Sequence, residues 1–144
     1  MNPAKLWNSY RQVATQTAPP GQLVLMLYEG AIRFLDRALA GFLHEDPREF
    51  NETIHNNIQK AQNIIRELSN SLDRSAGELA DQLSRLYEYM DRRLMESNVR
   101  KEVDGIKEVV VRLTIVRDAW ATMLQSQHTS PIDDGRAHFV PSFL

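Results

Sequence analysis

The sequence of 144 residues contains no cysteine, which excludes disulfides, thiol nucleophiles, iron–sulfur clusters and most structural zinc sites. Glycine and proline are scarce, with six of each, so few positions interrupt regular secondary structure. Charges of the two signs nearly balance, at 17 Lys and Arg against 19 Asp and Glu. The sequence therefore offers no broad positive field for nucleic acid or anionic lipid, and no such partner is predicted.

Long apolar runs are also missing. The longest one, at 23–27, is far short of the roughly 20 residues that a membrane-spanning helix needs. The first ten residues lack the apolar region of a secretory signal. We therefore expect a cytoplasmic protein that does not insert into membranes, and the lack of cysteine is consistent with a reducing compartment.

What the sequence does contain is helical periodicity, with apolar residues recurring every three or four positions. No stretch alternates with a period of two, so no strand is predicted. Short connections between long helices favour antiparallel neighbours. We predict an all-α fold, an antiparallel up-down-up-down four-helix bundle that forms a single domain at 1–126, with a short helical segment at about 4–14 and a flexible tail at 127–144. The four long helices are expected at about 20–44, 47–73, 76–98 and 102–126.

Two helix starts have recognisable caps. Asp46 followed by Pro47 and Glu49 is typical of an N-cap, a first-turn proline and a capping-box acid. Ser75 followed three residues later by Glu78 indicates a second capping box.

The second and third helices each have one narrow apolar stripe, as a bundle core requires. The predicted core residues are Phe50, Ile54, Ile58, Ala61, Ile65, Leu68 and Leu72 in the second helix, and Leu79, Leu83, Leu86, Met90 and Leu94 in the third, with Tyr87 beside them.

The first and fourth helices have more apolar surface than a bundle core uses. On the first helix the apolar arc extends to Leu25, Ile32 and Leu39. On the fourth, Val111, Ile115 and Ala119 form a second stripe nearly opposite the core stripe. Such surface is usually covered by a terminal segment, a second copy of the chain or a partner. Because the first and last helices of such a bundle are neighbours, we expect the two sets close together, as one groove.

Polar groups that converge for catalysis are hard to find. Glu52 and His55 have the Glu-x-x-His spacing of di-iron bundles, but both project away from the core stripe, and the second pair that such a site requires is missing. The sequence contains no phosphate-binding glycine loop and no nucleophile motif. We predict no catalytic residues, no metal and no cofactor, and hence a protein that is not an enzyme.

Asn57 is a polar residue inside an apolar stripe, between Ile54, Ile58 and Ala61. If buried, it would fix the register between helices through hydrogen bonds; in a groove, it would bind the backbone of a partner.

Several blocks of the sequence resemble the FliS family of flagellin-specific export chaperones, in the right order and over about residues 5–126. The resemblance departs from the family pattern at Pro19 and Gly21, and it does not extend to the tail. The matching elements are Tyr10, Thr17-Ala18, Pro20, QLVLMLYEGAIRF at 22–34, KAQNIIREL at 60–68, LYEYMDRRL at 86–94, Asn98 and RDAW at 117–120.

This resemblance implies a cytoplasmic chaperone that holds the C-terminal segment of flagellin, prevents premature polymerisation and presents the subunit to the flagellar type III export gate. The predicted partner-binding residues are Tyr10, Leu25, Ile32, Leu39, Asn57, Val111, Ile115 and Ala119. The chain itself is expected to be a monomer or a weak homodimer.

Two other classes of function remain at this stage. A self-assembling structural bundle would pair the surplus stripes between identical chains. A ferritin-like metal protein would need inward carboxylates that the sequence lacks. The leading segment is expected to be a mobile cover over the first helix, and the tail either a disordered terminus or an occupant of the client groove.

Overall fold

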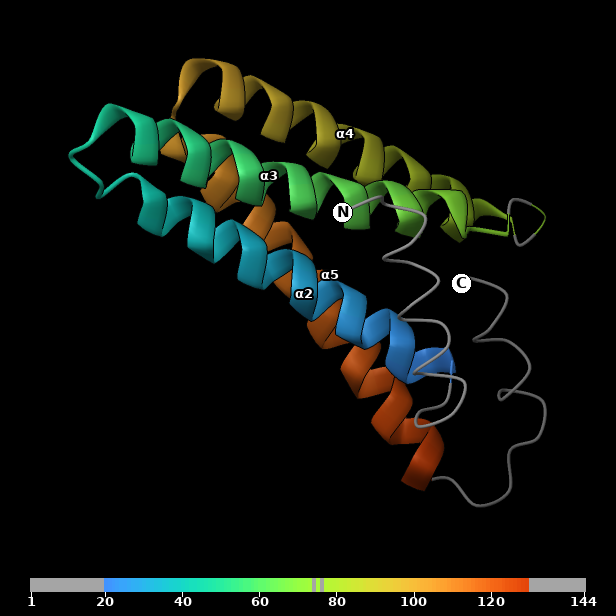
Figure 1. Ribbon diagram of the computed structural model, residues 1–144. Helices are drawn as coiled ribbons and strands as arrows, with labels where there is room; N and C mark the ends of the chain where they lie inside the picture. Colours follow the sequence, from blue (N-terminus) through green and yellow to red (C-terminus); the bar gives the residue numbers. More distant parts are fainter. Residues whose placement is uncertain (1–19, 74, 76, 130–144) are drawn as a thin grey trace.

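The computed structural model describes residues 20–73, 75 and 77–129, and the side chains as far as 126. These residues form four α-helices and, within these ranges, no strand, as predicted (Figure 1). Each predicted boundary lies within about one helical turn of the observed one. The leading segment and the end of the chain from 130 lie outside the described residues. The helices are α2 (Pro20–Gly41), α3 (Pro47–Asn70), α4 (Glu78–Arg100) and α5 (Val103–Thr129).

The helices pack in a ring in which α2 contacts α3 and α5, and α4 contacts the same two. Figure 1 shows α3 beside α4 and α2 beside α5, and the two pairs diverge toward the end of the bundle where α4 begins and α5 ends. None of the described helices has the length and apolar character needed to span a bilayer. The predicted four-helix bundle is therefore confirmed.

One continuous core fills the centre of this ring. Its largest fully buried side chains include Tyr28, Leu35, Met90 and Leu113, so that α2, α4 and α5 all contribute to it. The stripe predicted for α3 is confirmed, because all of its members are buried except Phe50, which is half-buried and packs against the core.

The stripe predicted for α4 is partly wrong. Met90 and Leu94 are buried, but Leu79 is 45% exposed and Leu83 is only half-buried. The buried side of α4 is instead displaced by one residue toward small side chains, which allow the neighbouring helices to approach closely. The residues on this buried side are Ala80, Ser84, Tyr87, Met90, Leu94 and Ser97.

The two predicted caps have different outcomes. Asp46 is the N-cap of α3, and its Oδ1 accepts a hydrogen bond of 2.8 Å from the Arg48 N–H, with Pro47 in the first turn. The second capping box is wrong: Gly77 occupies the N-cap position of α4 with φ +94° and provides no side-chain bond. Ser75 donates instead to Asp73 Oδ1, so its hydroxyl belongs to the loop.

A short connection holds the end of α4 against the start of α5. Lys101 has a left-handed backbone with φ 54°, and the Glu102 N–H donates to Ser97 O at 3.1 Å. A Cβ at Gly105 would overlap Ser97 Oγ and lie 3.1 Å from Arg93 O, so only glycine permits this approach. The polar side chains of both helices near this connection are thereby brought within reach of one another.

Candidate partner-binding surface

An apolar pocket opens between α4 and α5 at the end where the helix pairs diverge. Its volume is about 220 Å³. Leu79 and Leu83 from α4 form one side, and four residues of α5 form the other. The complete lining is Tyr28, Leu79, Leu83, Val116, Ala119, Trp120 and Met123. Leu79 and Leu83, which do not belong to the fully buried core, therefore face this pocket.

Next to the pocket, α5 exposes apolar side chains to solvent. Val111 is 57% and Ile115 63% exposed, and Ala119 is exposed as well. We call Val111, Ile115 and Ala119 the outer row, since they follow one another at intervals of one helical turn. Ala119 also lines the pocket, so the outer row and the pocket form one continuous apolar surface.

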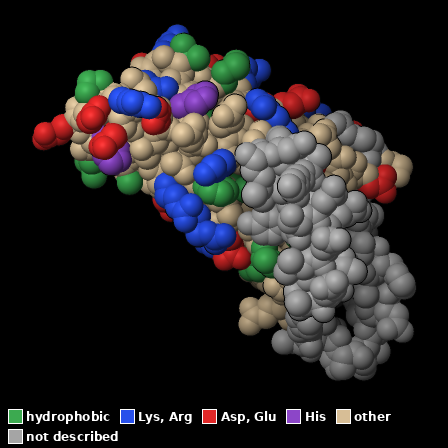
Figure 2. Space-filling view, in the orientation of Figure 1, with side chains coloured by type: hydrophobic (Ala, Val, Ile, Leu, Met, Phe, Trp, Pro, Cys, Tyr) green, Lys and Arg blue, Asp and Glu red, His purple; other side chains and the backbone are tan. Residues whose placement is uncertain are grey.

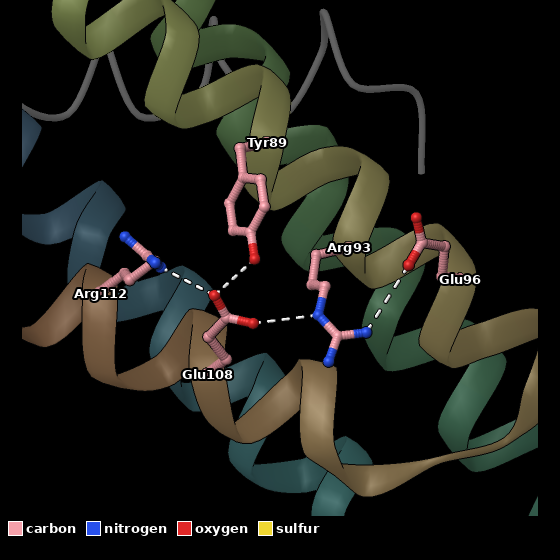
Figure 3. A network of polar contacts seen from close by, with 5 residues as sticks. All are labelled: Tyr89, Arg93, Glu96, Glu108 and Arg112. Carbon is pink, nitrogen blue, oxygen red and sulfur yellow. Dashed lines mark hydrogen bonds and ion pairs between the residues drawn. The ribbon is translucent and has the colours of Figure 1, made fainter.

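Closer to the start of α5, the same side carries a polar network centred on Glu108 (Figure 3). The Tyr89 hydroxyl donates to Glu108 Oε2 at 2.6 Å, and the Arg93 Nε–H donates to Oε1 at 3.0 Å. Arg112 donates to Oε2 at 3.0 Å, and Arg93 also pairs with Glu96 at 3.6 Å. These contacts tie α4 to α5 and leave two guanidinium groups at the surface.

The network perturbs the ionisation of its carboxylate. Hydrogen bonds from Tyr89 and then Arg93 hold the pKa of Glu108 at about 2, because they stabilise the charged form. The bond that Tyr89 donates raises the pKa of its own hydroxyl. Glu108 is therefore charged at any physiological pH, so its ion pair between α4 and α5 persists over this range.

The inner wall of the pocket rests on a buried tyrosine pair. The hydroxyls of Tyr28 and Tyr87 lie 2.5 Å apart, and both side chains are buried. Burial raises the pKa of Tyr28 to about 12 and that of Tyr87 well above its ordinary value. Both hydroxyls are neutral at physiological pH, so the pair is a hydrogen-bonded tie between α2 and α4.

The predicted residues of α2 lie beside α5, on a different side of that helix from the outer row. Leu25 and Ile32 flank Glu29 by four and three positions, so the three share one edge of α2. Glu29 pairs with Arg117 of α5 at 3.9 Å, which places this edge against α5. Arg117 and Ile115 are about 160° apart around α5, at roughly 100° per residue. The structure therefore does not bring the two predicted stripes together in one groove.

The α2 stripe is also less exposed than the outer row. Leu25, Ile32 and Leu39 are half-buried and pack against the core. Tyr10, the remaining predicted aromatic, lies outside the described residues.

Among the described residues Asn57 makes no hydrogen bond to another helix, so of its two predicted roles the register between helices finds no support. Its Nδ2 donates to Thr53 O at 2.8 Å, one turn back in its own helix, and the side chain is half-buried. Gln62 makes a contact of the predicted kind: it is buried, and its Nε2 donates to Asp91 O of α4 at 3.2 Å. A glutamine can span the gap between helices, whereas the shorter asparagine amide bonds to its own helix more readily.

The α4 side of the pocket and the network around Glu108 are features that the sequence does not predict. The spacing of Leu79 and Leu83 predicts a core stripe, but it fits a surface groove equally well. Nothing in the sequence of either helix singles out Tyr89, Arg93 or Arg112 as a network, because the alignment of α4 with α5 is not visible in either helix alone. Within the described residues, no three His, Asp or Glu side chains are grouped to hold a metal ion.

Comparison with known proteins gives consistent matches. A family model described as "Flagellar protein FliS" matches residues 3–127. The chain is 38% identical over 121 residues to the flagellar secretion chaperone FliS of Bacillus subtilis, which covers 84% of this chain and 87% of the relative. It is 38% identical over 118 residues to the Salmonella typhimurium protein of the same description, a match that covers 78% of this chain and 84% of the relative. The flagellar secretion chaperone FliS of Escherichia coli is 36% identical over 132 residues, which cover 88% of this chain and 94% of the relative. The range matched by the family model contains the pocket, the outer row and the network.

Proposed function

Since the chain belongs to the FliS family of flagellar secretion chaperones, we propose that its client is the C-terminal segment of flagellin. In this proposal the chain acts in the cytoplasm as a binding protein and not as an enzyme. It prevents premature polymerisation of flagellin and delivers it to the export gate of the flagellar type III apparatus.

The observation that carries this proposal is the continuous apolar surface of the pocket and the outer row. A small bundle with a well-packed core has no structural reason to expose Val111 and Ile115 beside an apolar pocket. A polymerising flagellin terminus is amphipathic, and binding its apolar face to this surface would remove that face from water and from other subunits. The exposed residues thus match the chemistry of the proposed client.

The α2 flank extends this surface in the proposal. Leu25, Ile32 and Leu39 lie on the other side of α5, so a client that engages both flanks must pass around α5 or around the end of the bundle. A client disordered in isolation can wrap in this way. Tyr10 and Asn57 complete the proposed binding residues. The Nδ2 of Asn57 donates to Thr53 O, and its Oδ1 would accept a hydrogen bond from the client backbone.

The affinity in this proposal is moderate. Ordering a disordered segment costs roughly 2–5 kcal/mol or more of the interaction free energy, so a large wrapped surface gives less affinity than its area suggests. Since the sequence has no phosphate-binding motif, competition at the export gate, and not nucleotide hydrolysis by this chain, would release the client.

The test is binding of a flagellin C-terminal peptide, measured by titration calorimetry and co-elution. Ile115→Asp is expected to lower the affinity at least tenfold, because a carboxylate in a buried apolar interface loses its hydration. The bundle should stay folded, since Ile115 is 63% exposed. Val99→Asp is the matched control: Val99 is 80% exposed on α4, away from the pocket, and its substitution should leave the affinity unchanged.

Self-assembly is the alternative, and the same experiment separates it. A peptide that fails to bind the unmodified chain, together with a dimer that persists on dilution, would support the structural bundle. A monomer or a weak homodimer that dissociates as the peptide binds would support the chaperone. Unfolding of the Ile115→Asp variant would place this residue in the core and remove it from the site.

A further inference from the structure

Three of the four helix–helix boundaries carry an ion pair between the helices. Arg66 of α3 pairs with Asp91 of α4 at 3.1 Å, and Arg93 of α4 pairs with Glu108 of α5 at 3.0 Å. At the third boundary Arg117 of α5 lies 3.9 Å from Glu29 of α2. In each of these places the chain neutralises its own arginine.

The α2–α3 boundary is different, although the contact between these helices is the most extensive in the bundle. Here the Arg37 Cζ and the Lys60 Nζ each lie 5.5 Å from the centre of the Phe34 ring. Arg33 lies one turn before Arg37 and is exposed. We call Arg33, Arg37 and Lys60 the basic cluster.

No carboxylate of the described residues lies within ion-pair distance of any member of the basic cluster. Asp36, although next to Arg37 in sequence, makes no such pair. Figure 2 shows Lys and Arg side chains gathered over the middle of α2 on this face. Two positive charges therefore lie over one aromatic ring, a third lies one turn away on α2, and the described residues provide no counter-charge at this boundary.

The geometry of the basic cluster favours one kind of partner. Arg33 and Arg37 are one turn apart on α2, a spacing that places Cβ atoms about 6 Å from each other. Carboxylates one turn apart on a second helix have the same spacing. The half-buried Phe34 ring, which Arg37 and Lys60 flank, adds an apolar contact. Three cations are fewer than the four to eight that polybasic membrane sites contain, and a net charge of −2 disfavours nucleic acid.

We propose that the basic cluster is a docking surface for an acidic helical segment of a partner protein, separate from the pocket and the outer row on which the proposed flagellin surface is centred. Carboxylates of the partner supply the counter-charges that this boundary lacks, and Phe34 contacts an apolar side chain between them. This surface would allow the chain to hold a second protein while its client is bound.

The experiment uses the full chain and a fluorescent 20-residue helical peptide with Glu at two positions one turn apart. The same peptide with Gln at those positions is the reference. We expect the Glu peptide to bind at least tenfold more tightly than the Gln peptide, with an affinity that falls as salt rises. The double variant Arg33→Glu/Arg37→Glu should lose at least tenfold in affinity for the Glu peptide and keep its affinity for the flagellin peptide.

The matched control is Arg85→Glu/Arg100→Glu, which changes the net charge equally through two exposed arginines of α4; it should bind the Glu peptide within about threefold of the unmodified chain. The neutral variant Arg33→Gln/Arg37→Gln should also weaken Glu-peptide binding, and it provides the test if the charge reversal unfolds the bundle. Equal losses in both charge-reversed variants, equal binding of the two peptides, or loss of flagellin-peptide binding would overturn the proposal. Preferential binding of phosphatidylglycerol vesicles or single-stranded DNA through the basic cluster would also overturn it.

Discussion

The hydroxyls of Tyr28 and Tyr87 illustrate how a single polar contact is tolerated inside this core. Each hydroxyl is buried, and each has the other as its partner at 2.5 Å. Removing both partners of such a bond is less costly than removing one, since a single deletion leaves a buried group without a hydrogen bond. The pair is therefore a sensitive probe of the α2–α4 contact.

We predict that Tyr28→Phe lowers the free energy of unfolding by about 1–3 kcal/mol, the cost of leaving the Tyr87 hydroxyl unpaired. The double variant Tyr28→Phe/Tyr87→Phe should be more stable than this single variant. Urea denaturation followed by circular dichroism measures both. A double variant that is less stable by the sum of two single losses would show that the hydroxyls do not act as a pair.

Glu108 gives a prediction with a defined pH window. Its pKa lies at about 2 in the folded chain, against an ordinary value of 4.5, so the folded state favours the carboxylate. The stabilisation is complete above pH 4.5 and is lost as the pH falls toward 2. We predict that Glu108→Gln lowers the free energy of unfolding by about 1 kcal/mol at neutral pH, as for a partly exposed network.

The measurement is the stability difference between the unmodified chain and Glu108→Gln at a series of pH values. This difference should shrink as the pH falls from 4.5 to 2. A difference that stays constant over this range would mean that the charge of Glu108 does not stabilise the α4–α5 contact.

At the scale of the helices, the two expected N-caps have the same sequence pattern but different hydrogen bonds. Both Asp46 and Ser75 occur in a sequence pattern typical of capping, yet only Asp46 bonds to the N-terminus of a helix. Asp46→Ala should cost about 1 kcal/mol of stability, the usual effect of losing an N-cap. Ser75→Ala should cost less than about 0.5 kcal/mol, as for a surface substitution without a capping role. Thermal denaturation of the two variants gives the comparison, and equal losses would restore Ser75 as a cap.

The α4 helix shows what periodicity leaves open. Leu79, Leu83 and Leu86 fit a core stripe, but the helix turns Ala80 and Ser84 inward. Helical periodicity identifies an apolar face to within about one residue, whereas the rotation of the helix depends on the neighbours that it packs against. Periodicity alone therefore does not predict the α4 side of the pocket.

At the scale of the whole molecule, the ring of contacts around one core predicts cooperative behaviour. Each helix makes its main contacts with two others, and the buried residues form a single cluster. We predict one unfolding transition, with equal calorimetric and van't Hoff enthalpies, as for a single domain. Scanning calorimetry of the full chain tests this. Two resolved transitions would show that the helix pairs α2–α5 and α3–α4 unfold separately.

The sequence by itself determined the four helices, their order, the Asp46 cap and the α3 core, because these depend on local spacing and local hydrogen bonds. It also located the outer row of α5, since two opposite apolar stripes on one helix cannot both face one core. Only the tertiary structure decided that the α2 stripe lies on another flank of α5, and that Gln62, not Asn57, bridges two helices. The pocket, the network around Glu108 and the basic cluster likewise depend on how the helices are rotated and aligned. Such arrangements arise from packing between segments distant in sequence, which the periodicity of one helix does not encode.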